Sequence, residues 1–101
     1  MDDGEARDEI KSILERGLAT EVHPRADSPE EVQSILDRLR VVSELPQKLA
    51  IAGFTLATIE HHGVEQACEA CMYFLVHRRF CDLPELRLAV EPRWSCRLWR
   101  I

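Results

Sequence analysis

The longest apolar run of the chain, LAIAGFTLATI at residues 49–59, constrains the fold most, because a small protein has to bury such a run. Apolar side chains recur through it at three- and four-residue steps, at Leu45, Leu49, Ala52, Leu56 and Ile59. This spacing favours a helix, and Ile51 and Phe54 widen its apolar surface beyond a single stripe. The run therefore predicts a central buried helix that opens near Ser43 and ends at Gly63. The run is too short to cross a bilayer.

Two further helices are predicted upstream. Residues 4–20 carry one apolar stripe, formed by Ala6, Ile10, Ile13, Leu14 and Leu18. In the segment SPEEV, Ser28 is a suitable cap, Pro29 fits the first helical position and Glu31 completes a capping box. A helix is therefore expected from this point to about residue 42. Its inward stripe is Val32, Ile35, Leu36 and Leu39.

Downstream of Gly63, one long and one short helix are predicted. Over residues 64–79, the side chains Val64, Cys68, Cys71 and Leu75 fall at steps of four, three and four, which is the core stripe of an amphipathic helix. Asp82 is positioned to cap a short helix that ends before Pro92. In the C-terminal segment, Trp94, Cys96 and Leu98 alternate with polar residues, which indicates an extended conformation.

These elements predict the fold class. The 101 residues fit one domain, covering residues 1–101. The expected architecture is all-α or mainly α: a compact bundle of about four helices, with a short helix and an extended C-terminal segment.

Charge is unevenly distributed along the chain. The net charge is −5, and the acidic residues dominate before residue 78, whereas six arginines lie in residues 78–101. An acidic body disfavours direct nucleic-acid binding and favours a basic protein partner. The acidic start MDDGEARDEIK lacks the basic and apolar regions of a secretory signal, so a cytoplasmic location without membrane contact is expected.

The segment HHGVEQACEAC holds two histidines and two of the four cysteines. On the predicted helix Cys68 and Cys71 share the apolar face, so they are expected to be buried core thiols without metal. The alternative is a mixed metal site formed by Cys68, Cys71 and either His61 or His62, with Cys81 as the fourth ligand. A second pair of cysteines at zinc-site spacing is missing, since Cys81 and Cys96 are isolated in the sequence. No cofactor is therefore expected.

Near a helix end, His61 and His62 would only complement the helix dipole.

Candidate partner-binding residues come from two regions. Four acidic side chains lie off the apolar stripes: Asp8, Glu15, Asp37 and Glu44. The alternative surface is the tail with Trp94 and Trp99, because tryptophan and arginine often form binding hot spots, although tryptophans more often cover a core. The sequence contains no nucleophile elbow, P-loop or HExxH motif, so an enzyme is not expected.

Small size, an acidic body and stretches such as DDGEARDE and DSPEEVQSILD give the chain a general likeness to one class of protein. In these respects it resembles bacterial immunity proteins, including those paired with contact-dependent growth-inhibition toxins. The resemblance is one of type over the whole chain, without a specific motif. It implies a binding protein that neutralises a basic, nuclease-type toxin domain through an acidic face, expected at Asp8, Glu15, Asp37 and Glu44.

Two other functions remain open from the sequence. One is a small helical regulatory or adaptor subunit that binds through its Trp/Arg C-terminal tail. The other is a zinc- or thiol-dependent protein that uses Cys68 and Cys71.

Overall fold

The computed structural model describes residues 2–101 and contains helices and small sheets in one compact body. Three α-helices come first, followed by short strands and one 3₁₀-helix. Their bounds are α1 Asp3–Glu15, α2 Pro29–Arg40, α3 Leu45–Ala52, β1 Ile59–His61, β2 Val64–Gln66, η1 Cys68–Ala70, β3 Phe74–Leu75, β4 Phe80–Cys81 and β5 Leu88–Ala89. The prediction of an all-α or mainly α four-helix bundle is therefore wrong, and the chain is a small mixed α/β domain.

The first two helices form where local signals place them. Asp2 caps α1 by accepting a hydrogen bond from the backbone N–H of Glu5, and Ser28 caps α2 by accepting one from the N–H of Glu31. Ile10 of α1 and Leu39 of α2 are almost fully buried, so the predicted stripes face the core. Both helices are confirmed in type, although α1 ends at Glu15 rather than at residue 20.

The predicted central helix is cut short at Gly53. This residue adopts a left-handed conformation with φ of 66° and caps α3 at its C-terminus. The backbone of Glu21 crosses so close to Gly53 that a Cβ atom there would collide with the Glu21 carbonyl group. Beyond it the chain is no longer helical: Phe54 is buried, Leu56 and Ile59 are half-buried, and Ala57 is exposed.

Two antiparallel sheets replace the predicted helix over residues 64–79 and the short helix after Asp82. Strands β1 and β2 form a hairpin in which His61 pairs with Val64. The two residues between them, His62 and Gly63, have φ values of 53° and 75°, which suits the tight turn of a two-residue hairpin. The second sheet has the order β3-β4-β5.

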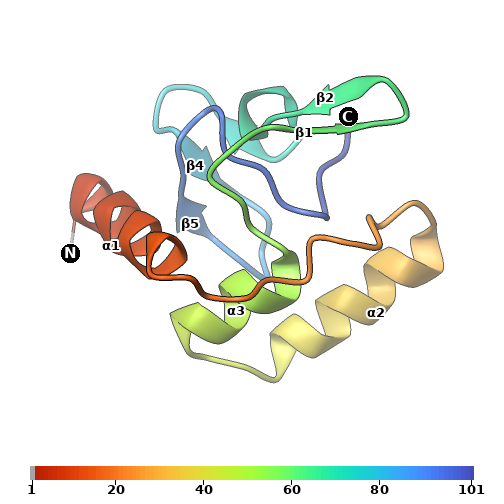
Figure 1. Ribbon diagram of the computed structural model, residues 1–101, viewed down its shortest axis with the longest axis horizontal. Helices are drawn as coiled ribbons and strands as arrows, with labels where there is room; N and C mark the ends of the chain where they lie inside the picture. Colours follow the sequence, from red (N-terminus) through yellow and green to blue (C-terminus); the bar gives the residue numbers. More distant parts are fainter. Residues whose placement is uncertain (1) are drawn as a thin grey trace.

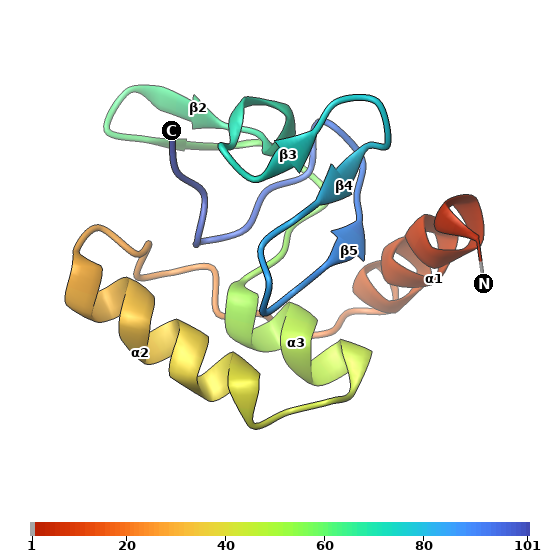
Figure 2. The same cartoon turned by 180° about the vertical axis from the view of Figure 1, so that it is seen from behind.

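The helices and the sheets form opposite sides of the molecule (Figures 1 and 2). In both views α2 and α3 lie below the strands, with α1 beside β5. The C-terminal segment runs between these layers. Within residues 2–101, no helix combines the length and the apolar character that crossing a membrane requires.

Residues 94–98 are buried along their whole length, since each has a relative exposure of 8% or less. Backbone hydrogen bonds join Ser95 to Thr55 in both directions, and the N–H of Arg97 donates to the carbonyl oxygen of Ala52. The segment is non-helical, in agreement with its two-residue period. The polar residues of this alternation, Ser95 and Arg97, are nevertheless buried as well. Their side chains form hydrogen bonds inside the molecule, which makes their burial tolerable.

Candidate metal centre

All four cysteines of the chain line one apolar cavity. Cys68 begins η1, Cys71 follows it, Cys81 ends β4 and Cys96 lies in the buried C-terminal segment. All four are free thiols. The remaining lining residues are Phe54, Tyr73, Phe74, Val90 and Trp99. The cavity volume is about 20 Å³, which leaves room for about one water molecule.

Backbone hydrogen bonds hold the cysteines around the cavity. The N–H of Cys71 donates to the carbonyl oxygen of Cys68 over 3.0 Å, which closes one 3₁₀ turn and keeps these two residues together. The N–H of Cys68 donates to the carbonyl oxygen of Trp94 over 2.7 Å, which ties this turn to the segment of Cys96. Cys81 pairs with Phe74 in the second sheet. Three segments that are distant in sequence therefore converge on one point.

The spacing of the sulfur atoms distinguishes between two kinds of metal site. Among residues 2–101, no three cysteine sulfurs lie within 4.8 Å of one another. Four thiolates around one tetrahedral zinc ion lie roughly 3.8 Å apart, because each Zn–S bond is about 2.3 Å. The four thiolate ligands of a 4Fe–4S cluster lie about 6.5 Å apart, because the cluster itself separates them. The cysteine sulfurs are therefore not grouped as the ligands of one tetrahedral zinc ion.

Burial keeps the thiols of Cys68, Cys81 and Cys96 protonated when no metal is bound. It raises the pKa of Cys68 far above its usual range, that of Cys81 to about 11 and that of Cys96 to about 12. Backbone hydrogen bonding from Leu83 and from Leu98 acts in the opposite direction on Cys81 and Cys96 and favours their thiolates. Each of these groups lies two residues after its cysteine.

An arginine without a carboxylate partner lies beside the cavity. Arg25 has only 2% exposure, and none of the salt bridges within residues 2–101 includes it. Its guanidinium group donates to the side-chain oxygens of Gln66 and Ser95 and to the carbonyl oxygen of Cys96. Burial lowers the pKa of Arg25, and the nearby Cys96 and Asp27 act against that shift. A buried cation normally has a nearby negative charge; the carboxylate of Asp27 acts in this way, and a metal–thiolate cluster would add to it.

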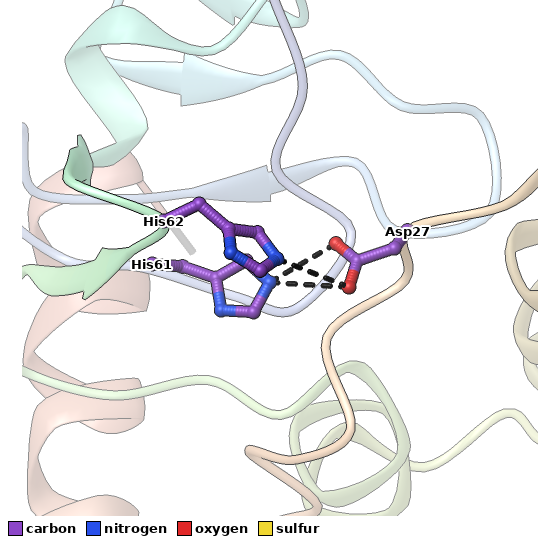
Figure 3. Close-up of side chains that lie close together, drawn as sticks. All are labelled: Asp27, His61 and His62. Carbon is purple, nitrogen blue, oxygen red and sulfur yellow. Dashed lines mark hydrogen bonds and ion pairs between the residues drawn. The ribbon is translucent and has the colours of Figure 1, made fainter.

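The predicted ligand set is only partly brought together. Cys68, Cys71 and Cys81 share the cavity, but the ring of His61 faces the carboxylate of Asp27 instead (Figure 3). Cys68 is buried as expected and Cys71 is half-buried, yet they do not lie on a helix stripe. Cys96 was absent from the predicted ligands. The number of cysteines could have pointed to Cys96, because the chain has four and a cluster requires four thiol ligands. A cluster does not require a second closely spaced pair of cysteines.

The four acidic residues of the expected binding face are all exposed. Asp8 and Glu15 lie on α1, Asp37 lies on α2 and Glu44 precedes α3, so the structure does not gather them into one cluster. Asp37 forms an ion pair with Arg40.

The tail offers little free aromatic surface. Trp94 is 5% exposed, and Trp99 is half-buried with its indole N–H donating to the carbonyl oxygen of Ala67. Arg93, which is exposed, forms ion pairs with Glu65 and Glu69 of the same molecule. These positions favour the interpretation of the tryptophans as core residues.

No protein-family model, curated protein or solved structure shows significant similarity to this chain.

Proposed function

We propose that the protein binds a 4Fe–4S cluster through Cys68, Cys71, Cys81 and Cys96 and acts as a one-electron carrier. The observation that carries the proposal is the convergence of every cysteine of the chain, from three separate segments, on one apolar cavity. This departs from the expectation of no cofactor, and it develops the thiol-dependent alternative that the sequence left open.

The residues that line the cavity are of the kinds that a cluster requires. Its ligands are four thiolates, and its potential depends on net charge, on hydrogen bonds to sulfur and on exclusion of solvent. The cavity offers four thiols, backbone hydrogen bonding at Cys81 and Cys96, and a wall that includes Phe54 and Trp99. A 4Fe–4S cluster with four thiolates has a net charge of about −2 in its common state, which the cation of Arg25 would partly balance.

A bound cluster would supply reversible transfer of one electron without transfer of a proton. The chain contributes the ligands and an apolar enclosure. Cys71 and Cys81 are only half-buried, so the cavity lies close to the surface on that side. If an electron donor or acceptor protein docked on that side, only a thin layer of protein would separate it from the cluster.

The proposal is tested by anaerobic reconstitution of the purified protein with ferrous iron and sulfide. Iron and acid-labile sulfide are then measured, and the cluster is identified by Mössbauer and electron paramagnetic resonance spectroscopy. We expect about four irons and four sulfides per chain. Replacement of any of the four cysteines by serine should reduce the cluster content sharply.

A matched control is Met72→Ser, because Met72 follows a proposed ligand but is exposed and does not line the cavity. This variant should keep its cluster, and circular dichroism checks the folding of every variant. One zinc ion per chain without sulfide, bound by the four thiols, would contradict the cluster. Retention of the full cluster by Cys96→Ser would contradict the proposed ligand set.

A second candidate function keeps the expected basic partner. None of the salt bridges within residues 2–101 includes Asp8, Glu15 or Glu44, so these exposed carboxylates remain available to an outside cation. This supports an inhibitory complex of the immunity-protein type, in which the chain neutralises a basic toxin domain. Association kinetics with a partner captured from the native host test it, as set out in the Discussion.

A further inference from the structure

A second group of metal-binding side chains lies outside the cavity, where Asp27, His61 and His62 point toward one another (Figure 3). The Nε2 atom of His61 is 3.1 Å from each carboxylate oxygen of Asp27. The Nε2 atom of His62 is 3.9 Å from Asp27 Oδ2. The two imidazole rings are 4.0 Å apart between centroids.

The hairpin turn explains why two consecutive histidines face the same way. Neighbouring side chains in a strand point to opposite faces. His61 ends β1, but His62 already lies in the turn, with φ of 53°, and its ring comes back beside that of His61. Gly63 completes the turn with a second positive φ.

The position of Asp27 is fixed independently of the histidines. Asp27 directly precedes Ser28, the residue that caps α2. Two residues earlier, the buried Arg25 donates a hydrogen bond of 2.9 Å to the side chain of Gln66 in β2. The loop before α2 and the β1–β2 hairpin are therefore held together before any ion binds.

The spacing of the three ligand atoms suits one tetrahedral ion. Bonds of about 2.0–2.1 Å to imidazole nitrogen and carboxylate oxygen place neighbouring ligand atoms roughly 3.4 Å apart. The observed 3.1 and 3.9 Å bracket this value. Two imidazoles and one carboxylate are typical zinc ligands, and the exposure of Asp27 and His62 leaves room for water at the fourth position.

We propose that Asp27, His61 and His62 form a surface site for a divalent cation of the zinc class. The bound ion connects the β1–β2 hairpin to the loop before α2, which lies 34 residues earlier. Its ligands include no cysteine, so the site exists whether or not the cavity holds a cluster. The alternative is a plain ion pair between His61 and Asp27 that binds no metal.

The test is a titration of the full chain with zinc ions alone, followed through the ring nitrogens of the histidines by nuclear magnetic resonance. This readout separates the site from zinc that binds to the thiols. The Nε2 signals of His61 and His62 should shift together and saturate, whereas those of His23 and His77 should stay in place. The variants Asp27→Ala and His62→Gln should weaken this binding by at least about tenfold, because each removes one ligand.

His77→Gln is the matched control and should bind zinc at the remaining histidines as the parent does. His62 is exposed, so its replacement leaves the core intact and the comparison does not depend on a folding defect. Equal shifts at all four histidines, or unchanged binding in His62→Gln, would show that the group is only an ion pair.

Discussion

The guanidinium group of Arg25 donates a hydrogen bond of 2.6 Å to the carbonyl oxygen of Cys96. This bond connects the most deeply buried charge of the loop before α2 to a proposed cluster ligand. It places a fixed positive charge next to the cavity, and that charge stabilises the more negative, reduced state of a bound cluster. The electrostatic consequence can be measured.

Arg25→Gln should lower the reduction potential of the reconstituted protein. We expect the ratio of oxidised to reduced cluster at a fixed potential to change about tenfold, which corresponds to ~59 mV for one electron. Arg25→Lys keeps the charge and should move the potential less. A redox titration followed by the visible absorption of the cluster gives both values. Equal midpoint potentials in the parent and in Arg25→Gln would mean that Arg25 has only a structural role.

Gly53→Ala should destabilise the protein by about 2–4 kcal/mol. The added Cβ would collide with the backbone of Glu21, which is itself held by a hydrogen bond to Ala50, and alanine is strained at a φ of 66°. Gly17→Ala is the matched control, since Gly17 also has a positive φ but no atom within 4 Å of the added group. It should cost only about 1 kcal/mol. Urea unfolding compares the two, and similar losses would rule out the close approach as the cause.

The metal-free protein should lose stability at alkaline pH. The folded state raises the pKa of Cys81 from 9.0 to about 11, so its stabilising contribution is complete below pH 9 and is lost as the pH rises through 11. For this thiol alone the loss by pH 10 is about 1 kcal/mol. Urea unfolding at pH 8 and pH 10 measures it, and Cys81→Ala should reduce the dependence. In the cluster-bound protein this contribution should vanish, because the ligands are already thiolates.

Neutralisation of Asp8, Glu15, Asp37 and Glu44 together should slow association with a basic partner and reduce its dependence on salt. Long-range attraction acts mainly on the encounter rate, and the Debye length is about 8 Å at ~0.15 M salt. Helical content should not change, since all four side chains are exposed. Stopped-flow kinetics over a salt series make the comparison, with Glu60→Gln on β1 as a control. Equal association rates at low salt would exclude this face as the steering surface.

The sequence predicts the parts of the fold that depend on local signals. Caps and stripes define α1 and α2 within a few residues, because Ser28 and its neighbours satisfy the helix ends themselves. The run after Gly53 was misassigned because its apolar residues also recur at helical spacing, whereas the close approach of Glu21 that ends the helix at Gly53 leaves no local signal. The helix expected over residues 64–79 rested on the spacing of Val64 and Leu75, and both of these are in fact exposed by 40% or more.

The candidate site was less predictable than the helices. The second sheet brings Cys81 close to Cys68, and the buried C-terminal segment brings Cys96 there. Contacts between residues this far apart in the sequence cannot be predicted from local spacing. The turn at His62 and Gly63 did carry a local signal, since glycine at the second turn position is typical of tight hairpins. That signal was assigned to a helix end instead.

The buried C-terminal segment has a consequence for biosynthesis. A ribosome makes the chain from its N-terminus, so α1, α2 and α3 leave the exit tunnel before residues 94–98 exist as a free segment. Those residues fill the middle of the molecule and pair with Ala52, Thr55 and Cys68. The nascent helices therefore have no complete core to pack on, and their apolar faces stay open to chaperones or to aggregation until residue 98 has emerged.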